Sequence, residues 1–136
     1  MFFQKNNIDN NDLSKIAALL IHAAKIDENY SKIEERIIKK TLLEIGANDH
    51  NVEEIINSGI KIEENSNQIL DFTKKVKSMK EENKIKIIET LWKIIYSNNQ
   101  ADIYETNLMR RLAGLLYIDS KLMGDIKERI KKEISK

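Results

Sequence analysis

Residues 20–45 read LIHAAKIDENYSKIEERIIKKTLLEI, and residues 91–116 read LWKIIYSNNQADIYETNLMRRLAGLL. The two stretches align at a constant offset of 71 residues. In both, an apolar helix end is followed by a short polar turn and then by a second apolar helix. Asp27 aligns with Asn98 and Glu34 aligns with Glu105. This repeated helix–turn–helix indicates two similar halves that pack face to face, with their polar turns at a common edge.

The composition favours helices. The chain has 136 residues, no Pro and only four Gly, so little in it interrupts a helix. Hydrophobic residues make up 41% of the chain and aromatic residues only 6%, which indicates an aliphatic core. No segment of useful length alternates with the period of two that a strand requires. We therefore expect an all-α protein.

Apolar spacing and capping residues predict about seven helices. Their expected starts are Asp12, Ser31, Asn51, Ser66, Ser78, Asp102 and Asp119 or Ser120. Ser31 and Ser78 each precede a Glu by three residues, which is the capping-box pattern. Gly46 is expected to end the second helix, and Gly59 the regular part of the third. The second helix is expected to bury a stripe of Ile33, Ile37, Ile38, Thr41, Leu42 and Ile45.

These elements predict a compact single-domain array with an internal pseudo-two-fold repeat. The domain is expected to span residues 1–136, with its core over about residues 12–130. The N-terminal residues and the Lys-rich C-terminal end are expected to fray. Short connections would make sequential helices near-antiparallel neighbours.

Charge and targeting signals restrict the classes of partner. There are 23 basic and 22 acidic residues, and this balance argues against a nucleic-acid partner and against electrostatic binding to membranes. The N-terminal residues show no signal-peptide pattern, and the longest apolar run, residues 16–24, is too short to span a bilayer. The chain has no Cys, as is common for cytosolic proteins. We expect a cytoplasmic protein that is not inserted into a membrane.

Three stretches of the chain carry a resemblance to a known family: residues 17–34, residues 72–92 with the sequence ETLWK at 89–93, and residues 105–116, which end in RRLAGLL. They resemble the TerB-like family, which is named for a bacterial tellurite-resistance protein and is also seen as the N-terminal domain of a DnaJ-type membrane co-chaperone. The resemblance covers nearly the whole chain. It implies a seven-helix fold with internal two-fold character and a role in the response to tellurite or oxidative stress.

In that family each turn typically reads Ala-Asp-Gly-Glu, with another Glu in the next helix, and the clustered acids resemble a divalent-cation site. The matching acids here are Asp27, Glu34 and Glu105, which are the expected metal ligands. The other turn positions carry Glu28, Asn29, Asn98, Asn99 and Gln100. Affinity for hard cations rises with the number of charged oxygen ligands, so any divalent cation is expected to bind weakly. No other cofactor is implied.

Helix capping offers a simpler explanation for two of the acids. Glu34 and Glu105 each lie three residues after a capping residue, Ser31 and Asp102, where a carboxylate bonds back to the backbone of the cap. Asp27 would then be a solvated loop acid. His22 is expected to be packed or hydrogen-bonded.

No motif for catalysis is present. The chain lacks Cys, a Gly-x-Ser-x-Gly elbow and a phosphate-binding loop, so we expect a non-enzymatic protein. Two functions remain open. One is a scaffold that binds a protein partner, with membrane-associated proteins among the candidates, through the face formed by Glu28, Asn29, Asn98, Asn99 and Gln100. The other is a module that responds to a divalent cation held between the turns. The oligomeric state is left open.

Overall fold

The computed structural model describes residues 9–25, 31–65, 70–96 and 103–134, without the side chains of residues 70–72, 75 and 103–106. These residues form seven helices: α1 (Asn10–Ala24), α2 (Lys32–Ile45), α3 (Val52–Glu64), α4 (Leu70–Lys77), α5 (Glu81–Tyr96), α6 (Ile103–Leu115) and α7 (Ser120–Ile134). Within those ranges no strand is formed. The prediction of an all-α fold is confirmed.

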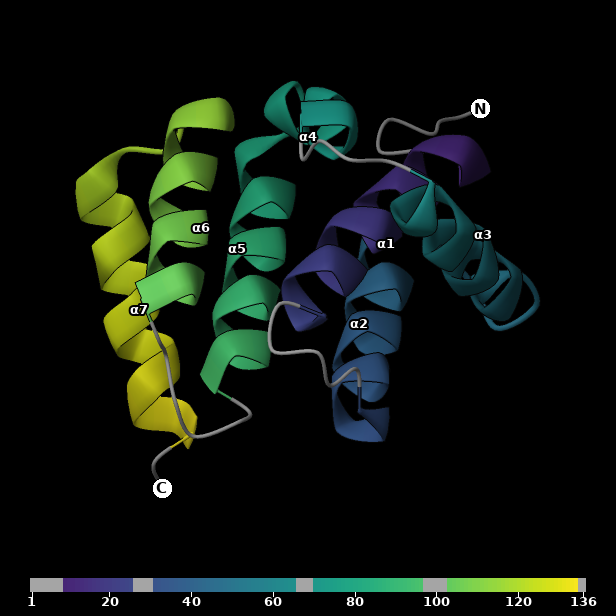
Figure 1. The fold of residues 1–136 in the computed structure, drawn as a ribbon, viewed down its shortest axis with the longest axis horizontal. Coiled ribbons are helices and arrows are strands. Elements are labelled where there is room, and N and C mark those ends of the chain that lie inside the picture. Colours follow the sequence, from purple (N-terminus) through teal and green to yellow (C-terminus); the bar gives the residue numbers. More distant parts are fainter. Residues whose placement is uncertain (1–8, 26–30, 66–69, 97–102, 135–136) are drawn as a thin grey trace.

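The helices form two halves, α1–α3 and α5–α7, with α4 above the line where they meet (Figure 1). In the first half α1 packs most extensively against α3, and in the second half α5 packs in the same way against α7. The two halves are joined where α5 packs against α1 and α2. Asn51 contacts Asn10 at one end of the α1–α3 pair and Glu63 contacts Lys25 at the other, so α1 and α3 run in the same direction.

Backbone hydrogen bonds recur at the offset of 71 residues. The bonds from Leu13 to Asp9, from Ala47 to Leu42 and from Val52 to Asn48 are matched by those from Lys84 to Lys80, from Ile118 to Ala113 and from Met123 to Asp119. Positive φ angles recur as well, at Gly46 (141°) and at Tyr117 (58°). The repeat therefore extends beyond the two aligned stretches, as far as the starts of α3 and α7.

Helix α1 lies at the centre of the core. The apolar spacing predicted one buried face, but every residue from Ile16 to Ile21 is fully buried. The reason is that α2, α3, α4 and α5 all pack around this helix. Residues 16–21 are all apolar, so this part of α1 has no polar side chain that would have to be removed from water when it is covered on all sides.

Gly59 does not end α3, which continues to Glu64, so that prediction was wrong. A Cβ added at Gly59 would lie 2.7 Å from the Cβ of Ala17, much closer than van der Waals contact. It would also lie 3.1 Å from the backbone carbonyl oxygen of Ser14. Only glycine fits here, because α3 lies directly against the backbone of α1. This close contact comes with a loss of helix stability, since glycine has a low helix propensity.

Two further local predictions were wrong. The N–H groups of Asn83 and Lys84 bond to the carbonyl of Lys80, so α5 begins at Glu81 and Ser78 is not its capping residue. Ile33 is 59% exposed, although the apolar stripe of α2 was expected to include it. The buried residues of α2 are Glu34, Ile38, Thr41, Leu42 and Ile45. The first position of that helical stripe is therefore taken by Glu34, and Ile33 points elsewhere.

Candidate functional site

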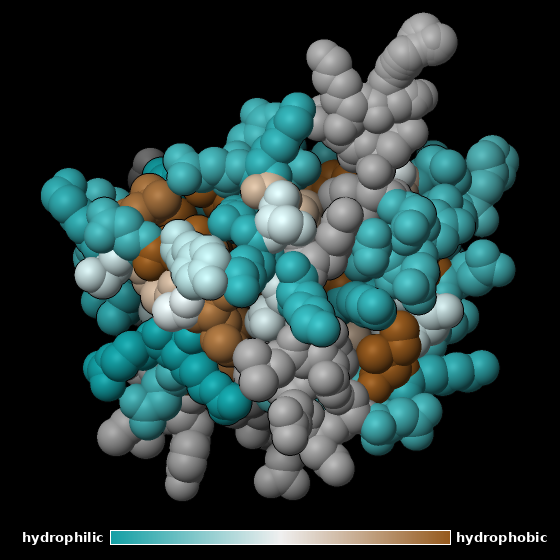
Figure 2. All heavy atoms as spheres, turned by 90° about the horizontal axis from the view of Figure 1, so that it is seen from above, coloured by the Kyte–Doolittle hydropathy of each residue, from teal (hydrophilic) through white to brown (hydrophobic). Residues whose placement is uncertain are grey.

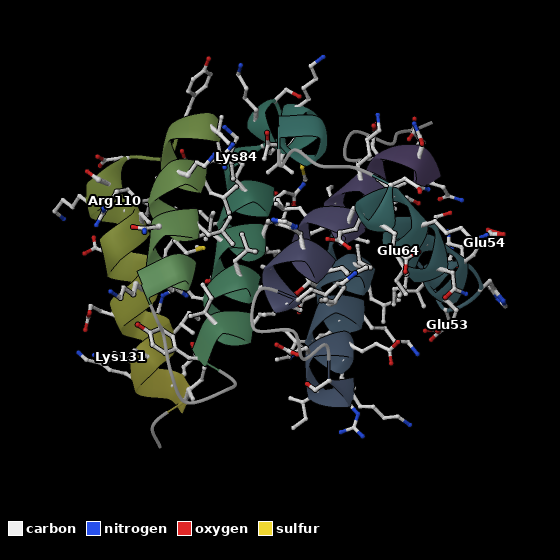
Figure 3. The ribbon with its side chains drawn as sticks, in the orientation of Figure 1. Glu53, Glu54, Glu64, Lys84, Arg110 and Lys131 are labelled. Carbon is white, nitrogen blue, oxygen red and sulfur yellow. The ribbon has the colours of Figure 1, made fainter. Side chains whose placement is uncertain are left out.

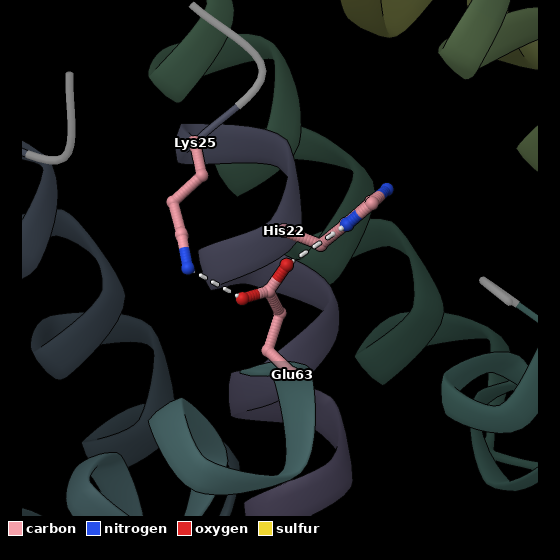
Figure 4. Close-up of polar contacts among 3 residues, drawn as sticks. All are labelled: His22, Lys25 and Glu63. Atoms are coloured by element: carbon pink, nitrogen blue, oxygen red, sulfur yellow. Dashed lines mark hydrogen bonds and ion pairs between the residues drawn. The ribbon is translucent and has the colours of Figure 1, made fainter. Parts of the chain in front are cut away.

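The end of α1 that leads into the first turn is tied to α3 by a cluster of three polar residues (Figure 4). Nζ of Lys25 lies 2.8 Å from Oε1 of Glu63, and Nδ1 of His22 lies 3.2 Å from Oε2 of the same carboxylate. The Glu63 side chain is only 11% exposed. The prediction that His22 is hydrogen-bonded is confirmed. We call these three residues the α1–α3 clamp.

The clamp changes the acidity of its carboxyl group. Burial by itself raises the pKa of Glu63, because it disfavours the charged form. The hydrogen bonds and charges of Lys25 and His22 outweigh burial and hold the pKa of Glu63 below its ordinary value of 4.5. Glu63 is therefore ionised at neutral pH and fixes the end of α1 electrostatically.

On the other side of the first turn, α2 begins with the predicted capping box. Oε1 of Glu34 accepts hydrogen bonds from the backbone N–H of Ser31 at 2.8 Å and from its hydroxyl at 3.1 Å. The N–H of Glu34 donates to Oγ of Ser31 at 3.2 Å. The Glu34 side chain is fully buried. The capping role predicted for Glu34 is confirmed, and these bonds engage one of its two carboxylate oxygens.

Most of the other predicted site residues lie outside the described residues. These are Asp27, Glu28, Asn29, Asn98, Asn99 and Gln100. Glu105 lies in α6, but its side chain is also outside the described part of the structure. Within the described part, no group of three or more His, Cys, Asp or Glu side chains is placed to hold a metal ion. The proposed sharing of ligands between the turns stays a prediction.

The helix ends that flank both turns lie on one side of the molecule. In Figure 1 the C-terminal ends of α1 and α5 and the N-terminal ends of α2 and α6 all point to the lower side. The helices that carry these ends are packed together, since α5 contacts both α1 and α2. The described framework is thus compatible with two turns at one edge.

Sequence reasoning missed the acid of the clamp. Glu63 lies 41 residues after His22 and has no local motif that distinguishes it from its neighbour Glu64. The signal that could have found it is helical register. Once α3 is placed parallel to α1, Glu63 is the acid that faces the end of α1.

No helix in the described ranges is long and apolar enough to cross a membrane.

Comparison with known proteins identifies the family. No curated protein and no solved structure matches the chain. A family model described as "Tellurite resistance protein TerB" matches residues 13–128, which include all but the ends of the helical array. The chain belongs to the TerB tellurite-resistance family.

Proposed function

We propose that this chain is a non-catalytic, cytoplasmic module that binds a protein partner through the face around its two polar turns. The partner is a cytoplasmic protein or the cytoplasmic part of a membrane-associated one. The proposal is supported by the helix ends that carry both turns, because they lie on one side of the molecule (Figure 1). The clamp and the capping box support it further, since each fixes a helix end beside the first turn.

The observation that carries the proposal is the exposure of Ile33. Its side chain is 59% exposed in the first turn of α2, immediately after the polar turn. Single exposed apolar residues are common, but protein interfaces combine an apolar centre with a polar rim. Ile33 together with Glu28 and Asn29 gives this composition within a short stretch of sequence. We infer that Ile33 is the apolar contact of the binding face.

The family description names tellurite resistance, which supports a place in the response to tellurite. We propose that the chain acts there as an adaptor, without a reaction of its own. If so, a strain without the protein should lose tellurite resistance, and the gene should restore it. The variant Ile33→Ser should fail to restore resistance although it folds.

The binding face is tested by comparing variants with matched charge changes. The variant Asp27→Asn with Glu28→Gln removes two acids from the turn. The control Glu54→Gln with Glu64→Gln removes two exposed acids from α3, on the right of Figure 3. The proposal requires that the turn variant and Ile33→Ser lose a partner in affinity capture that the control retains. Retention of every partner by all three folded variants would exclude this face.

The alternative is a module that responds to a divalent cation held between the turns. The capping bonds of Glu34 argue against a strong site, because one of its oxygens already accepts two hydrogen bonds. Thermal unfolding with and without millimolar Ca²⁺, Mg²⁺, Mn²⁺ and Zn²⁺ decides between the two functions. A cation that binds only the folded protein raises its stability by RT ln(1 + [L]/Kd). A rise that disappears in Asp27→Asn would favour the cation-responsive module.

A further inference from the structure

The second half contains an open groove. The groove has a volume of about 470 Å³ and lies where α6 and α7 meet over α5. Trp92, Met109 and Met123 give it an apolar floor, and Gly114 of α6 and Gly124 of α7 also line it. Seen from above, apolar surface is visible on the left of the molecule, which is the side of α6 and α7 (Figure 2).

The internal repeat explains why the groove is open. At the offset of 71 residues, Ala113 and Gly114 of α6 correspond to Leu42 and Leu43 of α2. Leu42 is fully buried, and Leu43 is half-buried and packs against the core. The second half therefore keeps the backbone of the repeat but lacks two leucine side chains. The groove is the space that this loss leaves.

A charge is missing at the same place. In the first half Nζ of Lys39 on α2 lies 2.8 Å from Oε2 of Glu53 on α3. The corresponding positions in the second half are Arg110 and Gly124, and both line the groove. Arg110, on the left of Figure 3, has no ion pair within the described part of the chain. The acid that the repeat would place opposite this cation has been replaced by glycine.

The other charged residue of the lining is also a cation. Nζ of Lys127 lies over the ring of Trp92, 5.4 Å from its centroid. Trp92 is only 3% exposed, and within the described residues its Nε1 has no hydrogen-bond partner. Among the described residues, the lining thus presents two cations and no acid. A negatively charged occupant is complementary to this groove.

The two glycines leave room for a backbone. A Cβ added at Gly114 or Gly124 would meet no atom within 4 Å. Gly59 shows what a helical glycine permits in this fold, because there a second helix lies directly against it. The spaces in front of Gly114 and Gly124 are open, so a helix from outside can approach equally closely.

We propose that the groove between α6 and α7 binds an amphipathic helix of a partner protein. This helix brings aliphatic side chains to the space above Ala113 and Gly114, and a carboxylate to Arg110. It thereby supplies what Leu42, Leu43 and Glu53 supply within the first half. Such helix-in-groove recognition is a common mode of peptide binding, and methionine-lined floors adapt to it well. Ile33, which carries the proposed function, is in α2 and does not belong to the described lining of the groove, so the proposal does not depend on the proposed function.

A selection from a library of displayed helical peptides tests the groove with the intact chain. Enriched peptides are then titrated against the protein with tryptophan fluorescence, since Trp92 is its only tryptophan and lies in the groove floor. We expect enriched peptides to carry neighbouring Leu or Ile residues and at least one Asp or Glu on the same face. Failure to enrich any peptide, or enrichment without acids, would overturn the proposal.

Groove variants show whether enriched peptides bind at the proposed place. Ala113→Leu with Gly114→Leu fills the groove as the first half does, and should abolish the fluorescence change while the protein stays folded. Arg110→Glu should weaken binding about tenfold. The variant loses the attraction of a surface ion pair and adds a repulsion of similar size, and each contributes a small free energy. A peptide whose acid is changed to Lys should recover affinity for Arg110→Glu.

The matched control for charge is Lys131→Glu, which reverses an exposed cation of α7 outside the lining of the groove (Figure 3). It should bind the peptides as the unmodified protein does. Equal binding by the filled variant would place the peptides elsewhere and overturn the proposal. Self-association of the chain that the filled variant abolishes would also overturn it, because the occupant would then be a second copy.

Discussion

The two halves of the molecule follow the same backbone course but fill it differently. The hydrogen bonds at the starts of α1 and α3 and at the end of α2 recur 71 residues later, at the starts of α5 and α7 and at the end of α6. In the first half Leu42 is fully buried and Leu43 packs against the core, and in the second half the corresponding Ala113 and Gly114 line an open groove. The comparison teaches that helix ends preserve the fold, while side-chain volume can be lost from one half to expose a surface.

The halves also differ at the end of their first helix. In the first half Lys25 and His22 bond to Glu63 of α3. The position that corresponds to Glu63 is Ile134, which is 40% exposed. The position of Lys25 corresponds to Tyr96, whose ring stacks on Trp92 with their centroids 5.9 Å apart. An ionic clamp between two helices, α1 and α3, thus corresponds in position to an aromatic stack within a single helix, α5.

The largest expected effect tests the difference in side-chain packing between Leu42 and the corresponding Ala113. Leu42→Ala should lower the free energy of unfolding by about 3 kcal/mol, because it leaves a cavity around a fully buried side chain. The converse change at the corresponding position, Ala113→Leu, should cause no loss, since the groove has room for the larger side chain. Urea denaturation measures both. Similar losses for the two variants would show that the second half is as tightly packed there as the first.

The next largest effect concerns the contact between α1 and α3. Gly59→Ala should destabilise the protein by about 2 kcal/mol, because overpacking against Ala17 outweighs the gain in helix propensity. Thermal unfolding provides the measurement. If Gly59→Ala were stabilising, α3 could not lie as close to α1 as described.

The clamp should make the stability of the first half depend on pH. Glu63→Gln should cost about 1–2 kcal/mol at neutral pH, because it weakens charge-assisted bonds to Lys25 and His22. The folded-state pKa of Glu63 is depressed, so its stabilisation is present above the ordinary pKa of 4.5 and is lost as the pH falls through the folded-state pKa. The difference between the two proteins should therefore shrink in acid.

Urea denaturation of both proteins at a series of pH values measures this difference. Glu54→Gln is the control, since it changes an exposed acid of the same helix. A difference for Glu63→Gln that stays constant down to low pH would mean that the carboxylate charge contributes nothing.

The smallest effect has the opposite sign to that at Gly59. Gly114→Ala should raise stability by about 0.8 kcal/mol, since the added methyl group meets nothing and alanine favours the helix. The midpoint of thermal unfolding should rise by about 3 °C. A loss of stability would indicate that the groove is closed in solution.

The sequence was sufficient for those parts of the fold that depend on local signals. The repeat was visible as a constant offset, and the box of Ser31 and Glu34 marked the start of α2 because its two partners are three residues apart. The same pattern at Ser78 misled, because there the chain starts its helix at Glu81. A capping motif indicates a position where a helix can begin, and the packing of the whole fold determines whether the helix begins there.

The candidate sites depend on relations that periodicity does not contain. The clamp joins residues 38 and 41 positions apart and exists only because α1 and α3 are parallel. In the aligned stretches Leu42 and Leu43 correspond to Ala113 and Gly114, so the smaller side chains of the second half were visible in the sequence. That this difference leaves a groove becomes clear only once the neighbouring helices are placed. Ile33 was predicted to be buried because it is apolar and lies next to the buried stripe of α2, but the structure shows it exposed.

The position of Trp92 makes the cooperativity of the two halves measurable. This one indole lies in α5 of the second half, whereas helices of both halves contribute to far-ultraviolet circular dichroism. Denaturation curves from tryptophan emission and from circular dichroism should coincide if the duplicated units unfold as one. Curves with separate midpoints would instead reveal two folding units, each retaining the autonomy of a single copy of the repeat.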